Sequence, residues 1–324
     1  SFGRNGVRLT SSINMKNNKI LIVGTGALAT LFAAKLSAIG VDITMLGSWL
    51  EGLSALKEKG ATLVGIDGGE KSYPVRVVSD AADCVGADFA LVLVKSWQTE
   101  RTASQLGRCL SPNALAVTLQ NGLGNGEILS KTLGRERVAQ GVTTTGASLL
   151  APGVARAGGE GKISIETHPR LGPLSAILTE AGFNLAVVPS AVSLIWSKLV
   201  INAAINPLTA LLNIPNGELL LRPTARALMG NLADEAASVA EVQNIPLSFD
   251  NPVAAAEDVA ERTSSNISSM LQDLRRGAPT EIDAICGAVT RIGKKYSIPT
   301  PLNQLCWQLV QARTEVPNHG KIQE

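Results

Sequence analysis

Residues 19–46 read KILIVGTGALATLFAAKLSAIGVDITML, and this stretch decides the fold of the N-terminal half. Lys19–Val23 predicts a strand, Ala27–Ile39 a helix that ends at Gly40, and Val41–Leu46 a second strand. The turn between the first strand and the helix is GTGALA. Such a turn brings a pyrophosphate close to the N–H groups at a helix N-terminus. Alone it is weak evidence, but its place after a first strand predicts a dinucleotide site made by Gly24, Thr25, Gly26, Ala27, Leu28 and Ala29.

Short strands and helices continue to alternate beyond this unit. We expect a helix over Leu50–Lys59 and further strands near Ala61–Ile66, Val75–Val78, Phe89–Val94, Leu115–Leu119 and Arg137–Val142. This alternation predicts a parallel sheet covered by helices on both faces. Ala155–Ala157 and Lys162–Ile165, separated by GGEG, predict a hairpin added to that sheet.

The sequence pattern changes after residue 189. Long helical patterns follow at 191–212, 222–243, 252–262 and 279–312. A length of 324 residues also favours two domains. We therefore predict a Rossmann-type α/β dinucleotide-binding domain at 19–189 and a helical substrate-binding and catalytic domain at 190–316. Residues 1–18, which contain three basic residues and no acid, predict a disordered leader, and residues 317–324 a tail.

Composition excludes several classes of protein. With 45% apolar and 17% charged residues, the chain can bury a substantial core. A net charge of +2 and 3% aromatic residues argue against a nucleic-acid partner. The most apolar run, 190–212, is interrupted by Lys198 and Pro207, so no membrane partner is expected. The four cysteines lack the spacing of a metal site and predict reduced thiols of a cytoplasmic protein.

Lys198 is the first candidate for proton chemistry. It is the only charged residue between Glu180 and Glu218, inside an apolar helical pattern. An ionised lysine is costly to bury, so it either extends to the surface, finds a partner or lowers its pKa. Asn202 and Asn206 follow at i+4 and i+8, on the same stripe of the helix. One cation and two amides on one face could hold a carboxylate and its neighbouring carbonyl.

Four more polar residues stand at suggestive places. Pro279 predicts the start of a helix, which puts Glu281 and Asp283 in a first turn that favours acids. Spacing alone does not choose between this structural role and a functional one. Lys95 and Asn121 each follow a buried strand, at the sheet edge where α/β proteins bind ligands, although such positions often hold simple turn formers.

The end of the second strand leaves the type of dinucleotide open. An NAD site expects an acid there, and an NADP site an arginine nearby, but residues 46–49 read LGSW. Ser48 can donate to a phosphate. We therefore favour NADPH and keep NADH as the alternative.

Together these residues resemble the 2-dehydropantoate 2-reductase (ketopantoate reductase) family, from about residue 19 to 313. Besides the glycine turn, the resemblance rests on LVKSW at 93–97, QNGLGN at 120–125, QGVTTTGAS at 140–148, WSKLVINAAINPLTALLNIPNGEL at 196–219 and SSMLQDLRRGAPTEID at 268–283. The last two segments are long and specific.

The resemblance implies reduction of 2-dehydropantoate to (R)-pantoate with NADPH, in pantothenate and coenzyme A synthesis. It implies that Lys198 is the catalytic proton donor and that Glu281 is an active-site residue on the cofactor side. It further implies cofactor contacts from Lys95, Asn121 and Ser148, and substrate contacts from Asn121, Asn202, Asn206, Asn216 and Ser269.

Two other functions remain open at this stage. One is a related D-2-hydroxyacid dehydrogenase or branched 2-keto acid reductase that uses NADH. The other is a non-catalytic protein that senses NADP, although the presence of both Lys198 and Glu281 counts against it. The oligomeric state also stays open, with a homodimer as one option.

Overall fold

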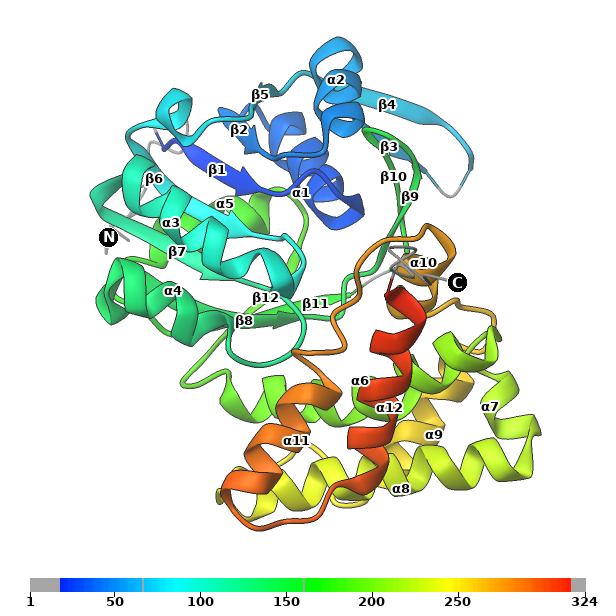
Figure 1. The fold of residues 1–324 in the computed structure, drawn as a ribbon. Coiled ribbons are helices and arrows are strands. Elements are labelled where there is room, and N and C mark those ends of the chain that lie inside the picture. Colours follow the sequence, from blue (N-terminus) through cyan, green and yellow to red (C-terminus); the bar gives the residue numbers. More distant parts are fainter. Residues whose placement is uncertain (1–17, 66, 160, 316–324) are drawn as a thin grey trace, which may run out of the picture.

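The computed structural model describes residues 18–65, 67–159 and 161–315 (Figure 1). An α/β part runs to Val188, and a helical part begins at Val192. The expected fold class, a Rossmann-type part followed by a helical part, is confirmed. Nearly all of the expected leader and the whole expected tail lie outside the described residues.

The main sheet has eight strands in the order β12-β11-β8-β7-β6-β1-β2-β5. Neighbouring strands are parallel except for β11 and β8, which are antiparallel. Their bounds are β1 Ile20–Val23, β2 Ile43–Leu46, β5 Arg76–Val78, β6 Ala87–Val92, β7 Leu110–Thr118, β8 Val138–Thr143, β11 Lys162–Glu166 and β12 Asn184–Val188.

Two hydrophobic cores cover the two faces of this sheet. Ile20 and Ile22 of β1 pack in the core that contains α1 (Ala27–Ala38) and α5 (Gly172–Glu180). Leu21 and Val23 of the same strand pack in the core of α3 (Thr99–Cys109) and α4 (Asn125–Leu133). Because successive strand residues face opposite sides, a strand buried on both faces is apolar throughout, as β1 is.

A second, smaller sheet contains two strands, β3 and β10, that were expected in the main sheet. Its order is β4 (Glu70–Tyr73), β3 (Ala61–Val64), β10 (Val154–Ala157), β9 (Ala147–Ala151). The predicted strand near 61–66 therefore lies outside the main sheet, and α2 (Leu50–Lys59) leads into it.

The predicted hairpin of residues 155–157 and 162–165 is wrong. β10 pairs with β3 and β9, whereas β11 pairs with β8 and β12 of the main sheet. The glycines between β10 and β11 do not form a tight turn. Instead they allow this segment to lie close to the backbone of residues 144–146. A Cβ at Gly161 would lie 2.3 Å from the backbone of Thr145, and the N–H of Gly158 donates to the carbonyl of Gly146.

The helical part is built around α6 (Val192–Leu212), which contacts α8 (Pro223–Glu241), α9 (Pro252–Arg262), α10 (Ser269–Arg275) and α12 (Pro301–Thr314). By length and composition α6 could cross a membrane. However, 67% of its most apolar window is buried inside the protein, as expected of a core helix.

The helix expected over 279–312 is also wrong in part. Residues 277–285 form a loop, α11 covers Cys286–Lys295, and α12 starts only at Pro301. Ser297, between the two helices, has a positive φ of 59°, so the chain turns there. The short helices α7 (Glu218–Leu221) and α10 complete this part, and all four cysteines are free and buried, as expected.

Glu235 of α8 supplies the missing cap of α12. Its carboxylate accepts hydrogen bonds from the backbone N–H groups of Leu302 and Asn303 and from the Asn303 side chain, each at 2.9 Å. We expect Glu235→Ala to lower the free energy of unfolding by about 1–3 kcal/mol, because buried helix-end donors lose their acceptor. Urea denaturation measures this, with Asp234→Ala, an exposed neighbour, as the control. Equal stability of the two variants would contradict the prediction.

Candidate active site

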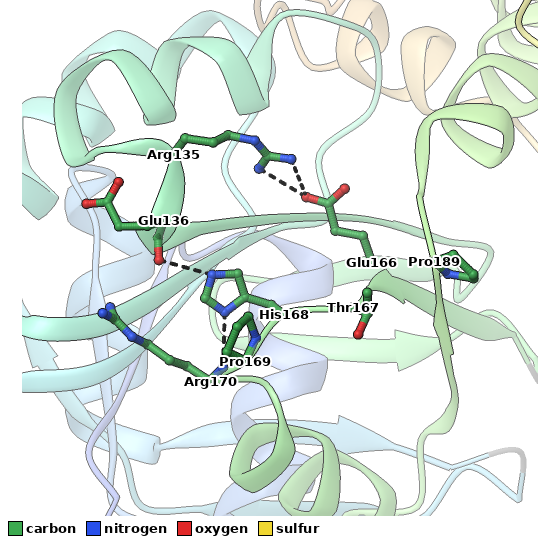
Figure 2. A pocket seen from close by; sticks show the side chains of 8 residues that line it. All are labelled: Arg135, Glu136, Glu166, Thr167, His168, Pro169, Arg170 and Pro189. Carbon is green, nitrogen blue, oxygen red and sulfur yellow. Dashed lines mark hydrogen bonds and ion pairs between the residues drawn. The ribbon is translucent and has the colours of Figure 1, made fainter.

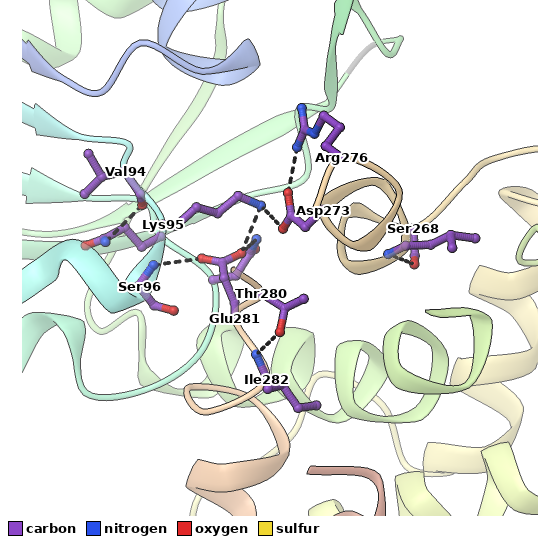
Figure 3. A network of polar contacts seen from close by, with 12 residues as sticks. Val94, Lys95, Ser96, Ser268, Asp273, Arg276, Thr280, Glu281 and Ile282 are labelled. Atoms are coloured by element: carbon purple, nitrogen blue, oxygen red, sulfur yellow. Dashed lines mark hydrogen bonds and ion pairs between the residues drawn. The ribbon is translucent and has the colours of Figure 1, made fainter. Parts of the chain in front are cut away.

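Four of the predicted site residues come from both parts of the chain and lie around the carboxyl edge of the main sheet. Lys95 follows β6 and Asn121 follows β7, whereas Lys198 lies in the first half of α6 and Glu281 in the loop between α10 and α11. Figure 3 shows the polar network that joins Lys95, Ser96 and Glu281. The network lies where the sheet edge meets the helical part.

Glu281 is held by groups of the α/β part. Its side chain is 5% exposed, Oε1 accepts from the backbone N–H of Ser96 at 3.0 Å, and Oε2 accepts from Nδ2 of Asn121 at 3.1 Å. The ammonium of Lys95 lies 3.7 Å from Oε2. The prediction that Glu281 lies in the first turn of a helix is therefore wrong. Its hydrogen bonds instead hold a loop against the sheet edge.

Asp283, which the sequence pairs with Glu281, has a different environment. It is exposed, and it accepts a hydrogen bond from the Trp307 indole N–H at 2.8 Å. Gln311 also donates to it, and the guanidinium of Arg291 lies 4.0 Å away. These contacts join the loop to α11 and α12, so Asp283 has a structural role.

Lys198 does not extend to the surface. The residue is half-buried, and its ammonium donates to the carbonyl of Thr143, at the end of β8, at 2.6 Å. Burial lowers the pKa of this ammonium from 10.5 to about 8, and the negative charge of Glu281 partly opposes that shift by raising it. A lysine with such a pKa can donate a proton near neutral pH.

The predicted substrate contacts lie on α6, after it and on α10. Asn202 is half-buried and Asn206 buried, on the same stripe as Lys198. Asn216 donates to Thr263 at 2.9 Å, and its buried Oδ1 has no hydrogen-bond partner among the described residues. Ser269 opens α10 and is half-buried.

Sequence reasoning missed Asp273. This aspartate on α10 is 2% exposed; its Oδ2 is 2.6 Å from the Lys95 ammonium and its Oδ1 2.6 Å from the Arg276 guanidinium (Figure 3). The only signal in the sequence was an acid three residues before an arginine, which is common on helix surfaces.

The glycine turn fits a dinucleotide. Gly24 has a φ of +127°, and a Cβ there would lie 3.3 Å from the backbone of Leu93. Gly26 is the N-cap residue of α1, and a Cβ added to it would meet nothing within 4 Å. The N-terminus of α1 therefore has free space beside Gly26, where the pyrophosphate of a dinucleotide would bind.

Two further predicted cofactor residues, Ser48 and Ser148, lie on or next to strands of different sheets. Ser48 is exposed directly after β2, and Ser148 is half-buried on β9 of the smaller sheet, which runs toward α10 in Figure 1. No group of three or more His, Cys, Asp or Glu side chains suited to a metal occurs within residues 18–65, 67–159 and 161–315.

A cavity of about 370 Å³ lies apart from this site (Figure 2). Arg135, Glu166, His168 and Arg170 are among its lining residues. Arg135 and Glu166 form an ion pair at 3.2 Å. Nδ1 of His168 accepts from the backbone N–H of Arg170, and Nε2 lies 3.0 Å from the carbonyl of Glu136. These groups bond to one another, and none of them is a predicted site residue.

Comparison with known proteins gives a consistent result over the described chain. The family model "Ketopantoate reductase PanE/ApbA" matches residues 20–170, and its C-terminal companion matches residues 191–314. The 2-dehydropantoate 2-reductase of Halobacterium salinarum is 33% identical over 298 residues, covering 90% of this chain and 98% of the relative. That of Archaeoglobus fulgidus is 35% identical over 304 residues, covering 92% and 98%.

Solved structures agree with these sequence matches. A PanE/ApbA family ketopantoate reductase from Ralstonia eutropha superposes with a TM-score of 0.85 at 29% identity, covering 91% of this chain and 98% of that one. A D-mandelate dehydrogenase with NADH and anilino(oxo)acetate has a TM-score of 0.86 at 27% identity, with the same coverage.

The titration of Lys198 can be measured without any ligand. Between pH 8 and 10.5 the unfolded chain holds the lysine proton more tightly than the native one, so the contribution of Lys198 to the unfolding free energy should rise with pH across this window. Glu281→Gln removes the charge that raises the pKa, so the pKa should fall further.

NMR of the lysine ε-carbons gives the pKa, with Lys198→Met to assign the signal. The difference in unfolding free energy between the wild type and Lys198→Met gives the stability term. A pKa of 10.5 for Lys198, or a higher pKa in Glu281→Gln, would show that this description of the site is wrong.

Proposed function

This chain belongs to the ketopantoate reductase family, and from that membership we propose that it reduces 2-dehydropantoate to (R)-pantoate with NADPH, in pantothenate and coenzyme A synthesis. The family consists of oxidoreductases, and a nicotinamide dinucleotide is its cofactor. The observation that carries the proposal is the approach of Glu281 and Lys198, from the helical part, to Asn121 and the end of β8 at the sheet edge.

Each part of the proposed site has a separate task. When bound, the dinucleotide supplies a hydride to C2 of the keto acid. The GTGALA turn binds its pyrophosphate, and Lys95 and Asn121 bind the end of the cofactor nearer the substrate. The Lys198 ammonium polarises the C2 carbonyl and gives its proton to the oxygen as the alcohol forms. The negative charge of Glu281 raises the pKa of Lys198 and so favours the protonated form that donates.

The amides and the hydroxyl hold the substrate. Asn202 and Asn206 follow Lys198 on one stripe of α6, where they can orient the carboxylate beside the reacting carbonyl. The unpartnered Oδ1 of Asn216 can accept from a substrate hydroxyl, which would remove the cost of that buried acceptor. Ser269 can donate to the carboxylate.

The charges of this region suit an anionic substrate. Lys95, Lys198 and Arg276 are cations, and Asp273 and Glu281 are the acids paired or coupled with them. Three positive charges against two negative ones leave one in excess, which the carboxylate of a 2-keto acid would balance.

Oxidation of D-mandelate is the second candidate, because a D-mandelate dehydrogenase with NADH has a similar structure and β2 ends with neither an acid nor an arginine. Reduction of 2-dehydropantoate, with NADPH and NADH in parallel, and oxidation of D-mandelate with both oxidised cofactors separate the two. A higher kcat/KM for mandelate would overturn the proposal. Cofactor binding without turnover of either substrate would favour the non-catalytic sensor.

We infer a cytoplasmic enzyme, because four free and buried thiols suit a reducing compartment. A homodimer, and the lack of nucleic-acid and membrane partners, stay predictions that sedimentation and binding assays can check.

Removal of the proposed proton donor is the sharpest test of the mechanism. Lys198→Ala should lower kcat by roughly 10²–10⁴-fold, the usual contribution of a general acid. The Kd of NADPH should hardly change, because the glycine turn lies in the other part of the chain. Lys198→Arg should not restore kcat, since a guanidinium hardly releases its proton. Turnover retained in Lys198→Ala would mean that another group donates the proton.

The cofactor preference gives a separate prediction. We expect a preference for NADPH that is weaker than an arginine-bearing site would give, because β2 ends without an acid and Ser48 is exposed there. Ser48→Arg should strengthen the preference, measured as the ratio of kcat/KM for NADPH and NADH. An unchanged ratio would show that the 2′-phosphate binds elsewhere, and a wild-type ratio of one or below would contradict the preference itself.

A further inference from the structure

Asp273 is a buried carboxylate to which the proposed mechanism gives no task. It lies on α10 of the helical part, and its side chain is 2% exposed. A buried charge is costly unless it is paired and hydrogen-bonded, so its partners should reveal why it is kept there.

Each oxygen of Asp273 has its own cation. Oδ1 accepts from Arg276, three residues along the chain, and Oδ2 accepts from Lys95, 178 residues away in the α/β part. Both distances are 2.6 Å, which is typical of strong charge-assisted hydrogen bonds. The Arg276 pair would by itself neutralise Asp273, so the pair with Lys95 is not needed for charge balance alone.

Lys95 lies between two buried carboxylates but is bonded to only one. Its ammonium is 2.6 Å from Asp273 and 3.7 Å from Glu281, which is an ion-pair distance without a hydrogen bond. Glu281 is instead hydrogen-bonded to Ser96 and Asn121. A lysine has three N–H donors, so the bond to Asp273 fixes the ammonium and leaves donors free for a ligand.

We propose that Asp273 is a positioning residue, which holds the Lys95 ammonium at the sheet edge, away from Glu281, in the orientation that binds the nicotinamide cofactor. The proposal rests on the proposed function, because it takes Lys95 as a cofactor contact. Without the Asp273 charge, the long side chain of Lys95 moves onto the nearest other carboxylate, Glu281. There it would compete with Asn121 for Glu281, and the N–H donors that the bond to Asp273 leaves free would no longer be held in place for the cofactor.

The simpler alternative is that Asp273 only ties the two parts of the chain together. In that case its loss should lower stability, and any loss of cofactor affinity should be independent of Lys95. A double-mutant cycle with cofactor affinity as the readout distinguishes the two roles.

The experiment titrates NADPH into the full chain by isothermal calorimetry, with the wild type, Asp273→Asn, Lys95→Met, the double variant and Asp273→Glu. Glu257→Gln, which breaks the ion pair of Glu257 with Arg226 elsewhere in the helical part, is the matched control. Circular dichroism and thermal unfolding show whether each variant is folded.

We expect Asp273→Asn and Lys95→Met to raise the Kd of NADPH to a similar extent, about tenfold or more, as the loss of one charge-assisted bond implies. The double variant should be no weaker than Lys95→Met, and Asp273→Glu should restore part of the affinity. At saturating NADPH, kcat should change less than the Kd. Glu257→Gln should bind as the wild type does.

Two results would overturn the proposal: an unchanged Kd in Asp273→Asn, or a double variant whose loss equals the product of the two single losses. The proposed function fails separately, if the wild type binds NADPH but reduces no 2-keto acid, and the cycle then still decides the role of Asp273. A wild type that binds neither NADPH nor NADH overturns both.

Discussion

The buried carboxylate of Glu281 is the constraint on which the site depends. A carboxylate that is 5% exposed needs hydrogen bonds, and the helical part supplies no donor to either of its oxygens among the described residues. Both oxygens are satisfied by the sheet edge, through the backbone of Ser96 and the side chain of Asn121. The loop that carries Glu281 therefore has to lie against the α/β part, and this contact sets how the two halves of the site meet.

The backbone of the facing loop is adapted to this contact. Gly122 has a φ of +80°, and a Cβ there would lie 2.5 Å from the carbonyl oxygen of Ala284. That same carbonyl accepts from the N–H of Leu123 at 2.9 Å. A residue larger than glycine would push the two loops apart and move Asn121 away from Glu281. Gly122 is thus what allows the two loops to touch.

Lys198 shows how burial and charge are balanced at the centre of the site. Burial beside the apolar helix α6 lowers the pKa of the Lys198 ammonium, whereas the negative charge of Glu281 raises it. The resulting pKa is about 8. Burial favours the neutral amine and the carboxylate favours the ammonium, and their balance suits the proton donor that we propose. The proposed role of Asp273 fits this balance, because it holds the second lysine at an ion-pair distance from Glu281 without a hydrogen bond to it.

The sequence by itself determined the features that depend on local pattern. The first strand, the GTGALA turn and α1 could be predicted because apolar spacing and glycine positions act over a few residues, and the lone charge of Lys198 in α6 stood out for the same reason. The hairpin of residues 155–165 and the helix start at Pro279 were wrong, because a partner strand and a hydrogen-bonded carboxylate elsewhere in the chain outweighed the local signal. The pairing of Lys95 with Asp273 had no local signal at all. Only the tertiary structure decided it, since 178 residues separate the two side chains and folding alone brings them within 2.6 Å.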